Sequence, residues 1–243
     1  MLKRLVPALA LVDYDNYANF RAFGTPTNAR HVEKALDNLV LDLLNCCKQE
    51  LPATNEIEAR LYGGWYDRDA GGKSQRLRML ESAISHFPAR CKGVRIILKP
   101  IDSLLAARHI PLRLEIRKET IKLKITDDML AKCACPDNCL TKLVAEWQKN
   151  GCPHCRAPKE EILQRTTQKA VDTAIVADLV HAAGLESSKL LVLVSNDYDL
   201  LPGALHAEAG PAPFRIICTN DRCALSHEVN KSTLYIVKPF AKK

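Results

Sequence analysis

Apolar runs and helical patterns alternate along the first hundred residues. Short apolar runs at 9–15, 57–67 and 93–100 are typical of buried strands. Between them lie amphipathic patterns. The first follows turn residues at Gly24, Pro26 and Asn28, and the second spans 74–87. This order predicts a parallel sheet covered by helices. The apolar face of the first expected helix consists of Val32, Leu36, Leu39 and Leu43.

The alternation stops after Pro100 and resumes with a helix expected to begin near Thr166 or Thr167 and to end at Gly184. Next come a strand at 189–195, a short helix after Pro202, a strand at 214–219 and an apolar stretch at 233–239 that could be an edge strand. The pattern therefore predicts an α/β domain made of residues 1–100 and 166–243. Residues 101–165 are expected to be an insertion.

The insertion has two parts, and the first is "LRLEIRKETIKLKI" at 112–125. Its apolar residues alternate with arginines, lysines and glutamates, which predicts a β-hairpin with one mostly basic face. That face could meet phosphates, or it could be an ordinary solvated surface.

The second part is rich in cysteine, because five of the ten cysteines fall within 23 residues. Three residues separate Cys135 from Cys139, two separate Cys152 from Cys155, and the 12 residues between the pairs can form a short helix. Such spacing favours a structural, tetrahedral Zn²⁺ site over disulfides or buried thiols. Two alternatives stay open, since Cys133 could replace Cys135 and His154 could replace a thiolate.

Composition and charge narrow the class of protein. The chain has 243 residues, a net charge of +7 and 47% apolar residues, values that suit a globular domain with one insertion. The charge is compatible with a polyanionic partner or with a solvated basic surface. The apolar start "LVPALALVDYD" is followed at once by acids, so we expect a core strand rather than a signal peptide, no membrane span and a cytoplasmic protein. A homo-oligomer or a protein partner is left open.

Acidic residues follow two of the expected strands. Asp13 and Asp15 end the first strand, and Asp197 and Asp199 end a later one. The carboxyl ends of parallel strands share one edge, where ligands bind, and Asp172 in the preceding helix could join them. Clustered carboxylates repel one another unless a divalent cation neutralises them, and ligands that are all oxygen favour Mg²⁺ or Mn²⁺. Such a site suits phosphoryl chemistry in which the metal activates water.

Plainer roles exist for acids of this kind. An Asp after a strand is often a turn residue or a helix cap. Asp178 lies about 240° round the helix from Asp172, so we expect it to form a salt bridge or a cap. Asp67 and Asp69 are expected to be loop residues. Asn16 could orient an acid or a water, or close an Asx turn.

Three segments resemble the motifs of NYN domains, which belong to the PIN-like nucleases: "LVDYDNY" at 11–17, "KAVDTAIVADL" at 169–179 and "VSNDYDLLP" at 194–202. The order and spacing of the motifs agree along most of the chain, apart from the insertion. Around the late acids, Asn196, Tyr198 and Leu200 stand where family members often have a small residue and Phe.

The resemblance implies a PIN-like three-layer fold and a Mg²⁺- or Mn²⁺-dependent nuclease that acts mostly on RNA and in some relatives on DNA. It implies a site made of Asp13, Asn16, Asp172, Asp197 and Asp199. Cations that could guide the nucleic-acid backbone are Lys73, Arg76, Lys122 and Lys124.

Two rival interpretations remain. "LVDYDN" also fits a haloacid-dehalogenase-like phosphatase, in which the first Asp of D-x-D is a nucleophile. The chain could also be an inactive nuclease-like module that binds nucleic acid or a protein.

Overall fold

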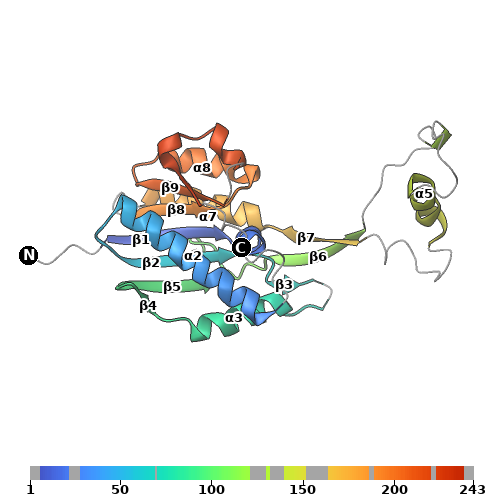
Figure 1. Ribbon diagram of the computed structural model, residues 1–243, viewed down its shortest axis with the longest axis horizontal. Helices are drawn as coiled ribbons and strands as arrows, with labels where there is room; N and C mark the ends of the chain where they lie inside the picture. The colour runs from blue at the N-terminus through green and yellow to red at the C-terminus, as the bar shows by residue number, and fades with distance from the viewer. Residues whose placement is uncertain are drawn as a thin grey trace, which may run out of the picture. The chain divides into compact units, whose positions relative to one another are not determined.

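The computed structural model describes residues 6–21, 28–68, 70–120, 130–131, 140–151, 164–185, 189–219 and 223–237. A seven-stranded sheet forms the centre, in the order β10-β9-β8-β1-β2-β5-β4 (Figure 1). The strands are β1 (Val6–Asp13), β2 (Thr54–Tyr62), β4 (Arg90–Cys91), β5 (Val94–Pro100), β8 (Leu190–Val194), β9 (Phe214–Cys218) and β10 (Leu234–Ile236). All neighbours are parallel except β4 and β5. This confirms the predicted α/β class with a mostly parallel sheet.

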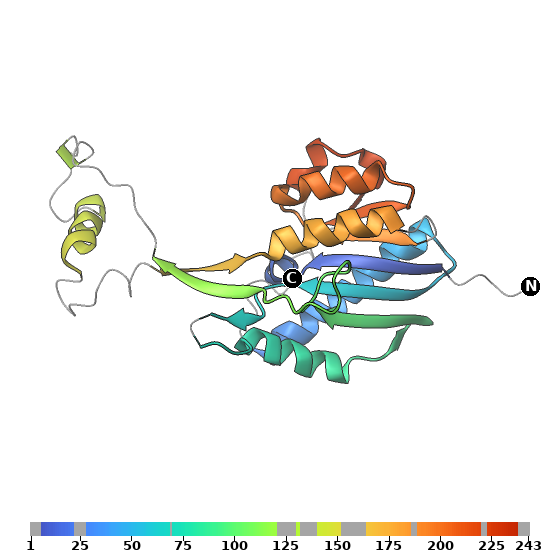
Figure 2. The ribbon, with the colours of Figure 1, turned by 180° about the vertical axis from the view of Figure 1, so that it is seen from behind.

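Helices cover both faces of this sheet. Helix α2 (Ala29–Glu50) crosses one face in Figure 1, and α7 (Val171–Leu185) crosses the other face in Figure 2. Helix α3 (Gln75–His86) packs against α2, and α8 (Leu201–Glu208) packs against α7. The core lies between each helix layer and the sheet.

Helix α2 shows how the sequence produces these layers. Asn28 caps its start, because the Asn28 side chain accepts a hydrogen bond of 3.0 Å from the backbone N of His31. The predicted apolar face is buried, and each such side chain contributes about 1.5–3 kcal/mol to folding. The four residues of that face are Val32, Leu36, Leu39 and Leu43.

The region before α7 differs from the prediction. Residues 164–169 form strand β7 (Gln164–Lys169) rather than the first turn of a helix, and α7 begins at Val171. Between them, Ala170 has a left-handed backbone with φ of 66°, which ends the strand and redirects the chain. Tertiary pairing decides the strand, since β7 joins a second sheet in the order β3-β6-β7.

The second sheet also changes the expected hairpin. Strand β6 (Glu115–Thr120) pairs in parallel with β3 (Tyr66–Asp67), and β7 is its other neighbour. Residues 121–125, the return half of the predicted hairpin, lie outside the described residues. A further helix, α1 (Tyr14–Arg21), starts directly after β1 and was not predicted.

The chain forms two compact units, residues 1–116 with 168–243, and residues 117–167. Residues 101–116, which the sequence assigns to the insertion, therefore belong to the larger unit. Specific hydrogen bonds explain this: the Ser103 carbonyl accepts from Arg60 at 2.6 Å, and the Leu114 carbonyl accepts from the backbone N of Trp65 at 2.9 Å. In the smaller unit, α5 (Leu140–Asn150) is the short helix predicted between the two cysteine pairs.

The cysteines predicted to bind zinc lie outside the described residues, and so does His154. A disulfide that the sequence analysis did not predict joins Cys218, at the end of β9, to Cys223. Among the described residues, no helix is both long enough and apolar enough to span a bilayer.

Candidate metal centre

The candidate site lies where the chain changes direction across the sheet. From β1 the chain builds β2 and β5 on one side, then returns through α7 to add β8 on the other side of β1. In α/β sheets such a switch point leaves a crevice at the carboxyl ends of the two strands. Asp13 is the last residue of β1, and Val12 pairs with Val194, the last residue of β8. Residues that follow β8 are therefore placed next to Asp13.

Three of the predicted acids meet at this edge of the sheet. Carboxylate oxygens of Asp13, Asp172 and Asp197 all lie within 4.8 Å of one another. Asp172 comes from the first turn of α7, so three separate elements supply the three acids. In the part of the chain that the structure describes, no other group of three His, Cys, Asp or Glu side chains is this close. Their ligand atoms are all oxygen, which suits Mg²⁺ or Mn²⁺.

Asp13 is the buried member of the cluster, with only 1% of its surface exposed. Its Oδ2 accepts hydrogen bonds from Asn16 Nδ2 at 2.7 Å and from Ser195 Oγ at 3.0 Å. Burial, together with the charges of Asp172 and Asp15, raises the pKa of Asp13 from 3.8 to about 6, although the hydrogen bonds from Asn16 and Ser195 lower it. Two neutral donors thus orient Asp13 without neutralising it.

Ser195 is a residue that the sequence analysis did not single out. Its hydroxyl donates to Asp13 and accepts from the backbone N of Asp197 at 3.0 Å. It is buried and connects the end of β1 with the loop after β8. The signal was present, because Ser195 lies in the segment "VSNDYDLLP" at 194–202, two residues before Asp197.

The two late acids differ in place. Asp197 Oδ1 accepts from the backbone N of Asp199 at 3.0 Å and caps the short 3₁₀ helix η1 (Tyr198–Leu200). Asp199 is exposed and is not in the group of three. It is still close enough to influence the cluster: burial raises the pKa of half-buried Asp172, and the charges of Asp197 and Asp199 raise it further.

Asp15 is buried but is directed to other partners. It forms an ion pair with Arg76 at 3.1 Å and accepts hydrogen bonds from the Gly64 backbone N at 3.0 Å and from Gln168 Nε2 at 2.5 Å. The backbone at Gly63 lies so close to Asp15 that a Cβ atom on Gly63 would be 2.9 Å from the Asp15 carboxylate. Arg76, predicted as a phosphate guide, therefore compensates Asp15.

Lys73 is the other predicted guide that the structure describes, and it too is engaged by an acid. Lys73 pairs with Glu81 at 2.7 Å on the surface, and Lys122 and Lys124 lie outside the described residues. Asp67, expected to be a loop residue, instead ends the short strand β3, and its Oδ1 accepts from the backbone N of Ala70 at 3.1 Å. Asp69 is outside the described residues.

The loop after β8 is anchored to the neighbouring strand. Asn196 and Thr219 exchange two hydrogen bonds: the Asn196 amide donates to the Thr219 hydroxyl, and the Thr219 backbone N donates to Asn196 Oδ1 at 2.9 Å. The Cys218–Cys223 disulfide lies beside this pair, and the Cys223 sulfur is 4.0 Å from the Ser195 carbonyl. These contacts hold Ser195 and Asp197 in position.

Asp178 has the salt-bridging role that the helix geometry predicts. Its carboxylate accepts from Arg60 Nη2 at 2.9 Å, from Tyr62 Oη at 2.5 Å and from the Leu105 backbone N at 2.6 Å. This buried cluster fastens the loop after β5 to α7.

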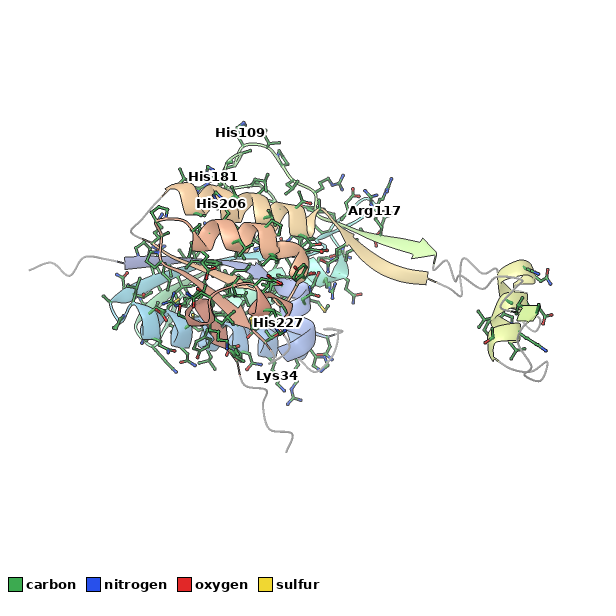
Figure 3. The ribbon with its side chains drawn as sticks, turned by 90° about the horizontal axis from the view of Figure 1, so that it is seen from above. Lys34, His109, Arg117, His181, His206 and His227 are labelled. Atoms are coloured by element: carbon green, nitrogen blue, oxygen red, sulfur yellow. A yellow bond between two sulfur atoms is a disulfide. The ribbon has the colours of Figure 1, made fainter. Side chains whose placement is uncertain are left out.

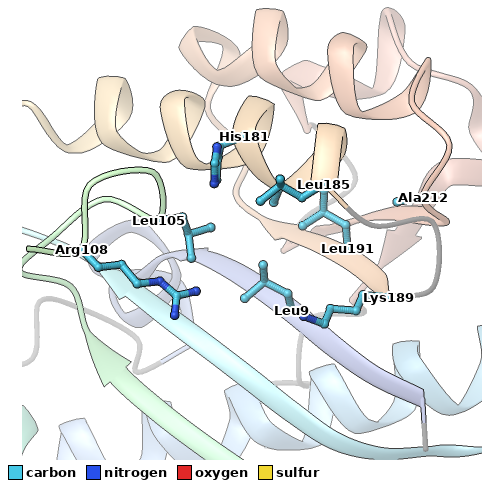
Figure 4. A pocket seen from close by; sticks show the side chains of 9 residues that line it. Leu9, Leu105, Arg108, His181, Leu185, Lys189, Leu191 and Ala212 are labelled. Atoms are coloured by element: carbon cyan, nitrogen blue, oxygen red, sulfur yellow. The ribbon is translucent and has the colours of Figure 1, made fainter.

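The described histidines lie elsewhere. Figure 3 shows His181 on α7 and His206 on α8, and no described histidine joins the acid cluster. His181 instead lines a small cavity of about 90 Å³ (Figure 4). The cavity is mostly apolar, with Arg108 and Lys189 at its border. His181 follows Asp172 by nine residues, about 14 Å along the helix, so this cavity is separate from the acids.

Comparisons with protein-family models, with curated proteins and with solved structures find no match to this chain. Functional interpretation therefore depends on the residues and geometry described above.

Proposed function

We propose that this chain is a Mg²⁺- or Mn²⁺-dependent nuclease that hydrolyses phosphodiester bonds of RNA or single-stranded DNA, with RNA as the favoured substrate. The observation that carries the proposal is the convergence of Asp13, Asp172 and Asp197 at the switch point of the sheet. A resemblance to NYN domains, with their PIN-like three-layer fold, supports it, because these acids are the residues that match the family motifs.

Each residue then has a defined task. Asp13, Asp172 and Asp197 would hold the divalent cation, and Asn16 and Ser195 orient Asp13 through their hydrogen bonds. A bound Mg²⁺ or Mn²⁺ would lower the pKa of water and offset negative charge on the phosphate. Asp199, exposed at the outer side of the cluster, can take up a proton from the attacking water and pass it to solvent.

The donors around Asp15 count against a phosphatase of the haloacid-dehalogenase type. That mechanism needs the second acid of D-x-D to exchange a proton with the leaving group. Here Asp15 is 2% exposed and is held by Arg76, Gly64 and Gln168. Burial raises the pKa of Asp15 and the charge of Arg76 opposes this rise. What counts against a proton exchange with a leaving group is that these partners enclose the carboxylate and leave it without a route to a substrate.

Cleavage of labelled single-stranded RNA and DNA in Mn²⁺, with EDTA as the blank, tests the nuclease. We expect Asp13→Asn and Asp197→Asn to reduce the rate at least about 100-fold, while the folded state persists in circular dichroism. Asp37→Asn is the matched control, since it makes the same charge change on the exposed face of α2. Full activity in both site variants would refute the proposal. Tight binding of RNA by the wild-type protein with no cleavage would favour the inactive binding module, and hydrolysis of a small phosphomonoester alone would favour the phosphatase.

We further propose a structural Zn²⁺ in the insertion, held by Cys135, Cys139, Cys152 and Cys155, with Cys133 as the alternate ligand. Support comes from the spacing of the two pairs around α5. Metal analysis of purified protein should find about one zinc per chain, and Cys152→Ser with Cys155→Ser should remove it. Freshly prepared protein without zinc would contradict this assignment.

A further inference from the structure

One aromatic side chain stands out by its exposure. The ring of Tyr198 is 51% exposed, and it is the only aromatic among the exposed large apolar side chains of the described residues. By contrast, Tyr14, Tyr17, Tyr62 and Trp65 each have at most 3% of their surface exposed. Aromatic rings contribute most to stability when they are buried, so an exposed ring needs another explanation.

Tyr198 stands between the two late acids of the candidate site. It is the first residue of η1, next to Asp197 of the metal cluster and to Asp199 at its outer side. The backbone here is held firmly, because Asp197 Oδ1 accepts from the backbone N of Asp199 at 3.0 Å and Leu200 is fully buried. A fixed backbone thus carries a solvent-exposed ring at the border of the site.

The charge of this border limits what could bind there. Asp197 and Asp199 flank Tyr198 in the sequence, so without a cation this surface repels phosphate. Arg76, a predicted cationic guide, is engaged with Asp15. The face of an aromatic ring, however, attracts a nucleobase by stacking, and this attraction tolerates any base because every base has such a face.

We infer that Tyr198 stacks on the base of a nucleotide adjacent to the phosphate that is cleaved, which makes the enzyme specific for unpaired strands. This inference rests on the proposed nuclease function and adds a substrate class to it. The base must be free to leave its partner and lie on the ring, so single-stranded nucleic acid is cleaved and a perfect duplex is not. Since stacking does not read base edges, the preference for sequence is weak.

The test compares Tyr198→Ala with Tyr198→Phe in cleavage of single-stranded RNA with Mn²⁺. Loss of one stacked base corresponds to about a 10-fold to 100-fold fall in kcat/KM for the alanine variant, expressed mostly in KM. Phenylalanine keeps the ring and should preserve most of the activity. Leu205→Ala is the matched control, because it removes a side chain of similar exposure (41%) from the following helix α8.

A second measurement separates stacking from other roles. A substrate with an abasic residue beside the cleaved bond should be poor for the wild-type protein and should make Tyr198→Ala no worse than wild type. If phenylalanine fails as badly as alanine, the hydroxyl rather than the ring is required, and the inference is wrong. It is equally wrong if alanine leaves kcat/KM unchanged or if duplex is cleaved as well as single strands.

Binding distinguishes this failure from that of the proposed function. Fluorescence anisotropy with the same labelled RNA, measured in Asp13→Asn with and without Tyr198→Ala, reads the stacking contact without cleavage. A wild-type protein that cleaves nothing refutes the nuclease. Equal affinity of these two variants refutes the stacking contact, whatever the outcome of the cleavage assay.

Discussion

Two buried aspartates of this molecule are compensated in opposite ways. Asp178 is 0% exposed and Asp13 is 1% exposed, so both carboxylates are removed from water. Asp178 has a guanidinium at 2.9 Å, a tyrosine hydroxyl and a backbone N–H. Among the described residues, the side chains that donate to Asp13 are an amide and a hydroxyl, and its burial and its acidic neighbours oppose its ionisation.

This comparison separates an acid that stabilises the fold from an acid that is a candidate for function. The protein supplies its own cation to Asp178, and the resulting cluster joins two segments of the fold. At Asp13 the carboxylates gather without a cation from the described side chains, so either a proton or the proposed divalent cation would compensate their charge. Perturbed acids grouped in a crevice are candidates for function for this reason.

The largest effect is expected from breaking the Asp178 cluster. Arg60→Met leaves the Asp178 carboxylate buried without a cation and should lower the free energy of unfolding by about 3–5 kcal/mol. Arg95→Met is the control, because the Arg95–Glu56 pair is exposed and should contribute less than about 1 kcal/mol. Urea denaturation measures both. Equal losses in the two variants would mean that burial does not distinguish these ion pairs.

The next effect concerns Asp13 and pH in EDTA. Its raised pKa means that the native state retains a proton that the unfolded chain has already lost. The contribution of this group to stability is therefore full below about pH 3.8 and is lost as pH rises through about 6, by about 3 kcal/mol in total.

Asp13→Asn has no ionisable group at this position, so it should not lose stability in this way as the pH rises. We therefore expect the free energy of unfolding of the variant, relative to wild type, to increase between pH 4 and pH 7, up to that amount. Denaturation at several pH values measures the difference, in which other titrating groups cancel. A difference that does not change with pH would show that Asp13 ionises freely in the native protein.

Metal binding should offset the electrostatic repulsion among the clustered carboxylates and so stabilise the native state. At a Mn²⁺ concentration of 100 times its Kd, binding to the native state adds about 2.7 kcal/mol to stability, which raises the Tm of the wild-type protein. Asp172→Asn should reduce this rise strongly, whereas Asp37→Asn should not. A rise that is equal in all three proteins would place the Mn²⁺ outside the acid cluster.

The smallest effect should come from the residue that orients Asp13. Ser195→Ala removes a hydrogen bond to Asp13 and another to the backbone of Asp197, so we expect a 10-fold to 100-fold loss of Mn²⁺ affinity, on the scale of other outer-shell partners of metal ligands. Isothermal titration calorimetry measures it. Unchanged affinity would indicate that Asn16 alone orients the carboxylate.

The sequence by itself determined the central α/β sheet and most of its covering helices. Periodic apolar positions such as those of α2 identify helices, and buried runs such as 190–194 identify core strands, because each pattern is local. It also indicated that Asp13 ends one parallel strand and that Asp197 follows another, and from this their approach to one edge follows.

Which acids lie close together depends on contacts that the local pattern does not contain. Asp15 follows Asp13 by two residues, yet its carboxylate contacts Arg76, Gly64 and Gln168, which come from distant segments. The same holds for β7, where pairing in the second sheet replaced the expected start of a helix. Local pattern determines which face of an element is buried, but the partner of a buried charge depends on contacts between segments far apart in sequence, and these exist only in the folded chain.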